Sequence, residues 1–133
     1  MTNPRVQPFL MFQDNDAEKA MNFYVSLFAD GEILEIHRYG ANEAGAEGSI
    51  KTAKFSIGHQ TVMCIDSPVK HEFTFTPAMS LFVDCQSEDE LKRLYSELAA
   101  AGSVLMPIEN YGFSRRFAWV SDRFGVSWQL NLA

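Results

Sequence analysis

The chain has 133 residues, of which 47% are hydrophobic and 13% aromatic, as in an ordinary globular protein. Its formal net charge of −6 gives no basic field for a phosphate backbone, so nucleic acid is excluded as an expected partner. No segment reaches the roughly 18 apolar residues of a membrane helix, and the N-terminus does not resemble a secretory signal. We therefore expect a cytoplasmic protein with no membrane partner.

The first half of the chain predicts a strand, a helix and three further strands. An apolar pattern over 6–13 precedes a DND turn, in which Asp16 stands where a helix N-cap is expected. Apolar residues recur at helical spacing to about Phe28, and Gly31 follows as an expected left-handed stop. A polar, Gly-rich loop over 40–48 is expected to cover or flank a pocket. The three further strands are expected at Ile33–Tyr39, Ser49–Ile57 and Gln60–Ile65.

The second half predicts the same succession of elements. After the strand Met79–Cys85, Ser87 and Glu90 form an S-x-x-E capping box for a helix that stops at Gly102. A ferredoxin-like domain has only two strands between its helices, whereas this chain predicts three. The remaining strands are expected at Ser103–Met106, Phe117–Ser121 and Val126–Leu132.

The two halves also share sequence. The run Leu10–Leu34 overlays Leu81–Leu105 without a gap at an offset of 71 positions, and six of the paired residues are identical. About one or two identities are expected from ordinary residue frequencies. Part of the likeness would arise in any two strand–helix–strand units, yet the run favours an internal duplication.

The fold class is therefore expected to be α+β, with two βαβββ modules in one domain over residues 1–133. Module 1 covers about 5–67, a linker about 68–77, and module 2 about 78–133. One module alone would bury little apolar surface, so we expect both to contribute to one domain. Cys64 and Cys85 each stand in an apolar strand pattern, which favours reduced core thiols over a disulfide or a zinc site.

Several motifs resemble the vicinal oxygen chelate superfamily, which includes glyoxalase I, bleomycin resistance proteins and extradiol dioxygenases. They are PFLMF (8–12), AMNFYVSLF (20–28), RYG (38–40), LFVDC (81–85) and DRFGVSWQL (122–130), and they are most similar to the PhnB-like branch. The likeness spans nearly the whole chain. It implies that each module forms a curled mixed sheet, that the sheets enclose a cleft for a small molecule, and that the protein pairs as a homodimer.

On that implied fold, alternation along the strands suggests which residues line the cleft. The expected lining is Phe9, Met11, Tyr39, Phe55, Cys64, Met79, Phe113, Trp119, Trp128 and Gln129. The alternative, for any one of them, is an ordinary place in the hydrophobic core.

Catalytic members of the superfamily hold a divalent metal through four strand residues. The equivalent positions here fall near Phe9, Cys64, Ala78 and Gln129. Phe9 and Ala78 have no ligating atoms, and a thiol must lose its proton to bind well, so the ligand set is incomplete and no metal or other cofactor is expected. His37 is the weak candidate for a general base, because it lies in a strand beside Arg38.

Relatives in this branch are often described as methyltransferases. S-adenosylmethionine usually binds a Gly-rich turn between a strand and a helix, but the nearest pair here, Gly45 and Gly48, lies between two strands. Methyl transfer is therefore judged improbable. The expected function is metal-free binding or sequestration of an apolar or aromatic small molecule. The alternatives are a metal-dependent lyase, isomerase or dioxygenase of the same superfamily and a purely structural domain.

Overall fold

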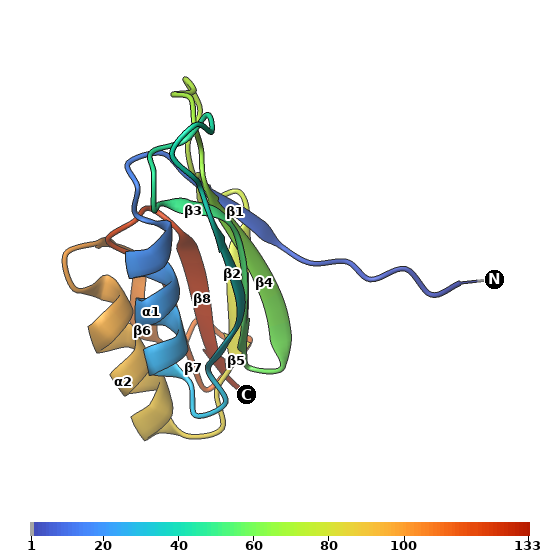
Figure 1. Cartoon of the computed structure of the whole chain (residues 1–133). Coiled ribbons are helices and arrows are strands. Elements are labelled where there is room, and N and C mark those ends of the chain that lie inside the picture. The colour runs from blue at the N-terminus through green and yellow to red at the C-terminus, as the bar shows by residue number, and fades with distance from the viewer. Residues whose placement is uncertain (1) are drawn as a thin grey trace. The chain divides into compact units, whose positions relative to one another are not determined.

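The computed structural model describes residues 2–133. The chain divides into two compact units, and the boundary between them in the sequence lies between Phe73 and Thr74. This boundary falls inside the expected linker. Both units mix helix and strand, so the fold is α+β (Figure 1).

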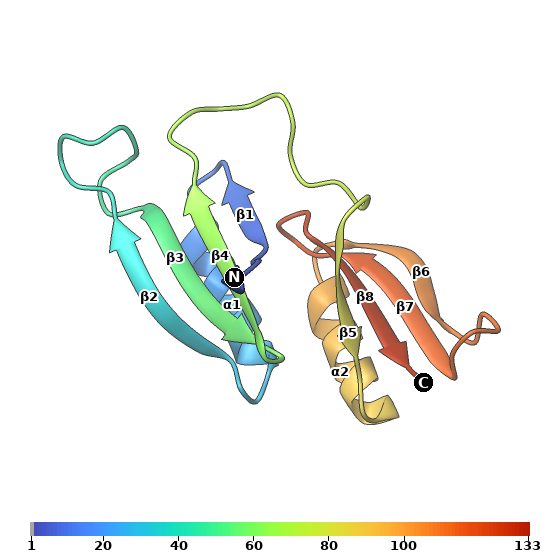
Figure 2. The same ribbon diagram turned by 90° about the vertical axis from the view of Figure 1, so that its right-hand side faces the viewer.

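The first unit is a four-stranded sheet with one helix on one of its faces (Figure 2). The strand order is β1-β4-β3-β2, in which β1 runs parallel to β4 and the other neighbours are antiparallel. The elements are β1 (Phe9–Phe12), α1 (Ala17–Leu27), β2 (Glu32–Arg38), β3 (Ile50–Ile57) and β4 (Gln60–Asp66).

The second unit repeats this arrangement, with the strand order β5-β8-β7-β6 and a parallel β5–β8 pair. Its elements are β5 (Ser80–Asp84), α2 (Glu88–Ala99), β6 (Ser103–Glu109), β7 (Arg116–Ser121) and β8 (Ser127–Leu132). The prediction of two similar βαβββ modules is confirmed.

In each unit the core lies between the helix and one face of the sheet. Met21 and Tyr24 of α1 are fully buried, as are Leu91 and Leu94 of α2. The opposite face of each sheet has no helix, and we call it the open face. Because strand side chains alternate between faces, the residues beside the buried set belong to the open face.

Of the four outer strands, β2 and β6 are irregular. The register of β2 against β3 shifts between Ile33 and Glu35 and again between His37 and Arg38. The register of β6 against β7 also shifts twice, and β6 contains Pro107, which has no N–H to donate. The parallel pairs β1–β4 and β5–β8 keep one register throughout.

The first strand is shorter than the apolar pattern over 6–13 predicts. Pro8 cannot donate to a ladder, although its carbonyl oxygen accepts from Met63 N at 2.8 Å. Beyond β1, the side chain of Gln13 takes the place of backbone pairing: its Oε1 accepts from His71 N at 2.6 Å, and its Nε2 donates to Phe73 O at 2.7 Å. Residues 71–73 therefore belong to the first unit.

The two helices begin with different caps. Asp16 occupies the N-cap position of α1, but its side chain makes no capping hydrogen bond. Asp66, at the end of β4, accepts from Ala17 N at 2.9 Å and from Ile50 N at 2.8 Å. Ser87 caps α2 as predicted, because its Oγ accepts from Glu90 N at 3.1 Å.

Gly31 is required for space and does not serve as a left-handed stop. Its φ is not positive, but an added Cβ would lie 1.9 Å from the carbonyl oxygen of Val25. At the repeat position, a Cβ on Gly102 would lie 2.1 Å from Ser121 O, while Ala101 adopts the left-handed φ of 60°. Gly31 follows the end of α1 as predicted. The predicted left-handed conformation is wrong, because glycine is needed there for lack of space for a Cβ.

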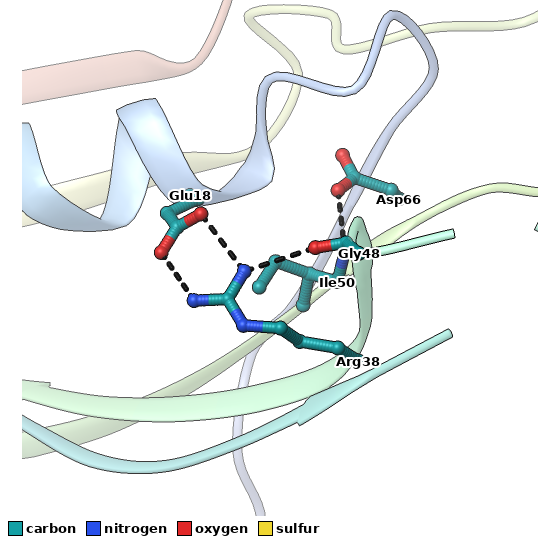
Figure 3. A network of polar contacts seen from close by, with 5 residues as sticks. All are labelled: Glu18, Arg38, Gly48, Ile50 and Asp66. Atoms are coloured by element: carbon teal, nitrogen blue, oxygen red, sulfur yellow. Dashed lines mark hydrogen bonds and ion pairs between the residues drawn. The ribbon is translucent and has the colours of Figure 1, made fainter. Parts of the chain in front are cut away.

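The Gly-rich loop between β2 and β3 is held against its own unit. Arg38 donates to both carboxylate oxygens of Glu18, at 2.9 and 2.6 Å, and to Gly48 O at 3.0 Å (Figure 3). Figure 3 also shows Asp66 bound to Ile50 beside this pair. Glu43 binds Lys51 and the amide of Gly40, so the loop is anchored by side chains at both ends and in its middle.

Candidate functional site

The open face of the second sheet arranges its side chains in three rows across the strands. One row is Ser80, Ser127, Ser121 and Ser103, which are successive backbone partners. The middle row is Phe82, Gln129, Trp119 and Met106, and the third is Asp84, Asn131, Phe117 and Glu109. A serine row thus flanks the middle row on one side, and on the other side stands a row, which we call the acidic row, with Asp84 and Glu109 at its ends and the Phe117 ring between them.

A chain of hydrogen bonds links the serine row to the middle row. Trp119 Nε1 donates to Ser127 Oγ at 2.8 Å, and the hydroxyls of Ser127 and Ser80 lie 2.7 Å apart. Gln129 Nε2 donates to Ser80 Oγ at 3.2 Å. These four side chains, which we call the serine–tryptophan network, come from three adjacent strands and hold one another in place.

Aromatic rings gather beside this network. Phe117 is buried under its neighbours, with ring centroids 5.0 Å from Phe113, 6.1 Å from Tyr111 and 6.4 Å from Phe82. Phe82 is 55% exposed and Phe113 is 63% exposed. Exposed rings that touch one another form a ready surface for an aromatic or apolar ligand.

The open face of the first sheet has a different chemistry. Phe9 pairs with Met63, and Met11 with Ile65, which gives an apolar half along β1 and β4. The other half carries charge: Glu35 Oε1 lies 3.7 Å from His37 Nε2 and 3.9 Å from Lys54 Nζ. The His37 side chain is 63% exposed, and no nucleophile is bonded to it among residues 2–133.

Four of the residues expected to line a cleft lie instead on the buried, helix-facing side. Phe55 is fully buried and its ring centroid is 6.1 Å from that of Tyr24 in α1, while Cys64 pairs with Ala53 on the same face. Trp128 is fully buried and donates to Asp122 Oδ2 at 2.9 Å. The strand alternation was therefore assigned in the wrong phase for Phe55, Cys64 and Trp128.

Tyr39 is the fourth of these residues. It follows β2, is 6% exposed, and its hydroxyl donates to Asp66 O at 2.9 Å. A Cβ on Gly45 would lie 2.3 Å from the Tyr39 ring, so the loop covers the ring closely. Tyr39 is a core residue that helps to hold this loop.

The other expected lining residues fall into two groups. Phe9, Met11, Trp119 and Gln129 lie on open faces, and Phe113 contacts Phe117 from the loop before β7. Met79 precedes β5 and is 66% exposed, outside the strand rows. The structure thus places Trp119 beside Gln129 in the second unit, and it places Phe113 against Phe117, which lies two residues before Trp119 in β7.

The four positions equivalent to a metal site do not share a face. Cys64 points toward the helix, and burial raises the pKa of its thiol to about 12, so the thiolate needed for coordination is scarce. Ala78 and Phe9 offer no ligating atom, which leaves Gln129. Within residues 2–133, no three His, Cys, Asp or Glu side chains form a group that could hold a metal ion. The donor set does not fit a divalent metal.

The glycines likewise do not fit a nucleotide-like methyl donor. Gly45 lies against the Tyr39 ring, and the amide of Gly48 donates to Tyr39 O at 2.9 Å. Both belong to a β2–β3 connection, and neither opens a helix whose N-terminus could receive a phosphate or carboxylate. Neither α1 nor α2 is long and apolar enough to cross a membrane.

The sequence analysis missed Ser80, Ser127 and Phe82. Serine is common in ordinary strands, so these residues carry no signal by themselves. The signal lies in register: once β5, β7 and β8 are aligned, Ser80, Ser127 and Ser121 share a row. The same alignment places Gln129 between Phe82 and Trp119.

Comparison with known proteins identifies the family. A family model described as 3-demethylubiquinone-9 3-methyltransferase matches residues 4–131. The solved structure of a PhnB protein from Bacillus cereus is 51% identical, covers 98% of this chain and 100% of its own, and superposes with a TM-score of 0.93. Protein YjdN of Escherichia coli strain K12 is 25% identical, with 96% of this chain and 94% of YjdN covered.

More distant structures share the fold. The fosfomycin resistance protein FosX from Listeria monocytogenes is 14% identical, and the match covers 98% of this chain and 93% of FosX with a TM-score of 0.65. The chain therefore belongs to the PhnB-like family whose model is described as 3-demethylubiquinone-9 3-methyltransferase.

Proposed function

We propose that this protein binds or sequesters a small aromatic or apolar molecule without a metal, on the open face of the second unit. The observation that carries the proposal is the set of touching rings around Phe117, two of which, Phe82 and Phe113, are more than half exposed. Binding would remove this apolar surface from water and allow stacking on the rings.

The electrostatics of this face suit a ligand without a negative charge. Asp84 and Glu109 occupy the third row, and no Lys or Arg stands in any of the three rows. Arg116, nearby in β7, is engaged by Glu88 with Nε and Oε1 3.1 Å apart. A carboxylate or phosphate group would therefore meet no free cation in these rows.

The alternative is a metal-dependent lyase, isomerase or dioxygenase. The observation in its favour is that FosX, which has the same fold, is described in complex with Mn(II). On this alternative, ligand binding or turnover depends on an added divalent metal. The incomplete donor set argues for the metal-free proposal.

The two tryptophans allow a direct test, because Trp119 lies on the open face while Trp128 lies under the helix. We expect naphthalene, added in the presence of a chelator, to shift the indole N–H resonance of Trp119 and leave that of Trp128 in place. W119F and W128F variants assign the two signals. The absence of any shift would contradict binding at this face, and a shift that requires Zn²⁺ would favour the metal-dependent alternative.

A pair of matched variants tests the position. Phe82 and Phe9 are equally exposed, at 55%, but lie on the open faces of different units. F82S should weaken naphthalene binding by about tenfold, since it removes one contacting ring, whereas F9S should leave binding unchanged. Weakening by F9S alone would move the site to the first unit.

The homodimer expected from the family resemblance is part of this proposal. Light scattering on the purified protein checks it: a mass near twice 15.0 kDa supports pairing, and a mass near 15.0 kDa argues against it.

A further inference from the structure

Counting hydrogens in the serine–tryptophan network shows that one hydroxyl hydrogen is left over, besides the second N–H of the Gln129 carboxamide. Each serine hydroxyl has one hydrogen and two acceptor lone pairs. The network uses one N–H from Trp119, one N–H from Gln129 and one hydroxyl hydrogen between Ser80 and Ser127. The hydrogen of the other hydroxyl has no acceptor among the hydrogen bonds of residues 2–133.

Burial decides which serine carries that hydrogen. Ser127 is 1% exposed, and an unused donor there would cost free energy, whereas Ser80 is half-buried at the rim of the same row. Ser127 therefore donates to Ser80. Ser80 then accepts from Ser127 and Gln129, both of its lone pairs are occupied, and its own O–H points to a group outside the network.

An acceptor lies beside this donor. Gln129 uses Nε2 toward Ser80, which leaves Oε1 of the same carboxamide without a hydrogen bond within the described chain. If the carboxamide were turned by 180°, Ser80 would donate to Oε1 and the NH₂ group would become the outward donor. In either orientation one of the two side chains, Ser80 or Gln129, offers a donor and the other an acceptor.

The flanking side chains are aromatic. Backbone partners place Phe82 on one side of Gln129 and Trp119 on the other. A group that satisfies the donor–acceptor pair would therefore lie between two rings, and a planar group fits between them with the least loss of apolar contact.

We infer that the ligand is a neutral aromatic lactam or carboxamide, whose C=O accepts from Ser80 and whose adjacent N–H donates to Gln129. This inference rests on the proposed binding face and adds the chemical class of the ligand. A carboxylate has no hydrogen to donate to Gln129 Oε1, so it leaves the pair half satisfied, and it also meets the acidic row of Asp84 and Glu109.

Three compounds of similar shape test the class: carbostyril, which has an aromatic lactam edge; N-methylcarbostyril, which keeps the C=O and lacks the N–H; and naphthalene, which has neither. Calorimetry should give carbostyril about tenfold higher affinity than N-methylcarbostyril, the change expected for one desolvated hydrogen bond, and about a hundredfold higher affinity than naphthalene, which lacks both bonds. The Trp119 indole resonance reports the same site for all three.

Two serine variants locate the effect. S80A removes the outward hydroxyl and should reduce the affinity for carbostyril about tenfold relative to the affinity for naphthalene. S121A is the matched control, since Ser121 stands in the same row and makes no side-chain hydrogen bond within residues 2–133. Thermal unfolding of both variants verifies that they are folded.

The outcomes separate this inference from the proposed function. Equal affinity for the three compounds, or an equal loss in S80A and S121A, would overturn the lactam assignment and leave aromatic binding standing. If none of the three compounds shifts Trp119, both proposals fall.

Discussion

The two units share a scaffold but differ on their open faces. The two sheets have equivalent strand orders, each with a helix on one face, and both units bury aliphatic and aromatic residues between helix and sheet. On the open face, the first unit carries Glu35, His37 and Lys54 beside Phe9, whereas the second carries serines, rings and carboxylates. The packing beneath the helix constrains the sequence in both halves, and the open face is where the halves diverge.

The helix caps show the same contrast. The α2 cap is local, since Ser87 and Glu90 are three residues apart. The α1 cap comes from Asp66, which is 49 residues from Ala17 and also binds Ile50. In the first unit one buried carboxylate thus connects the helix, β3 and β4, so helix capping there depends on the tertiary fold.

The largest expected effect would come from the feature that the units share. G31A and G102A each place a methyl group against a backbone oxygen, and we expect each to lower the free energy of unfolding by about 4 kcal/mol. Urea unfolding measures the loss. G40A is the control at about 0.5 kcal/mol or less, because its nearest neighbour is the flexible Glu43 side chain at 3.4 Å. If only one of the two variants loses much less stability than expected, the two glycines do not serve the same purpose in the two units.

The next effect sharpens the contrast between the caps. D66A leaves the amides of Ala17 and Ile50 buried without an acceptor, and should cost about 3 kcal/mol. S87A removes a local cap and should cost about 1 kcal/mol. Hydrogen exchange resolved by segment should show faster exchange in α1 for D66A and in α2 for S87A. Equal losses of unfolding free energy in D66A and S87A would show that Asp66 stabilises the first unit no more than a local cap stabilises the second.

The smallest effect concerns the ion pair between Arg38 and Glu18 in the first unit. The hydrogen bond from Arg38 lowers the pKa of Glu18 below its ordinary 4.5, so the pair stabilises the fold above that pH, and the contribution is lost as pH falls through the lowered pKa. R38M should remove the part of the pH dependence of the free energy of unfolding that comes from this pair. The loss of stability should be smaller than in the preceding variants, because both side chains are partly exposed.

Stability measured across the acid range checks this expectation. K19M is the matched control, since it removes a neighbouring exposed cation that makes no ion pair in the described chain. If the free energy of unfolding varies with acid pH in R38M as it does in the unmodified protein, or if K19M changes this variation equally, the ion pair does not stabilise the fold.

Much of the fold follows from local pattern. The spacing of Ala20, Met21 and Tyr24 predicts the buried face of α1, and the Ser87–Glu90 box predicts the start of α2. The phase of the β4 alternation was not predictable, because apolar residues stand on both faces there: Cys64 is buried while Met63 and Ile65 are partly buried beside it. In β3 the polar Lys54 and Ser56 alternate with the buried Phe55 and Ile57, so the sequence did carry the phase that was missed for Phe55. The family resemblance supplied the architecture and did not correct that phase.

The candidate site was only partly predictable. Trp119, Gln129 and Phe113 were identified from the sequence, whereas the serines that join Trp119 to Gln129 depend on strand register. Register arises from pairing between segments 47 residues apart, as in Ser80 and Ser127, and local patterns carry no information about it. The same reason explains why Asp66 was not recognised as the cap of α1.

The irregular outer strands β2 and β6 affect the tendency of the protein to aggregate at high concentration. A regular edge strand is a template onto which another chain can add, and repeated addition leads to fibres. The two register shifts in β2, and the two shifts with Pro107 in β6, interrupt the ladder that such growth would need. Aggregation by sheet extension is thereby suppressed at these two edges, while the faces that carry the protein's distinctive chemistry stay uncovered by helix.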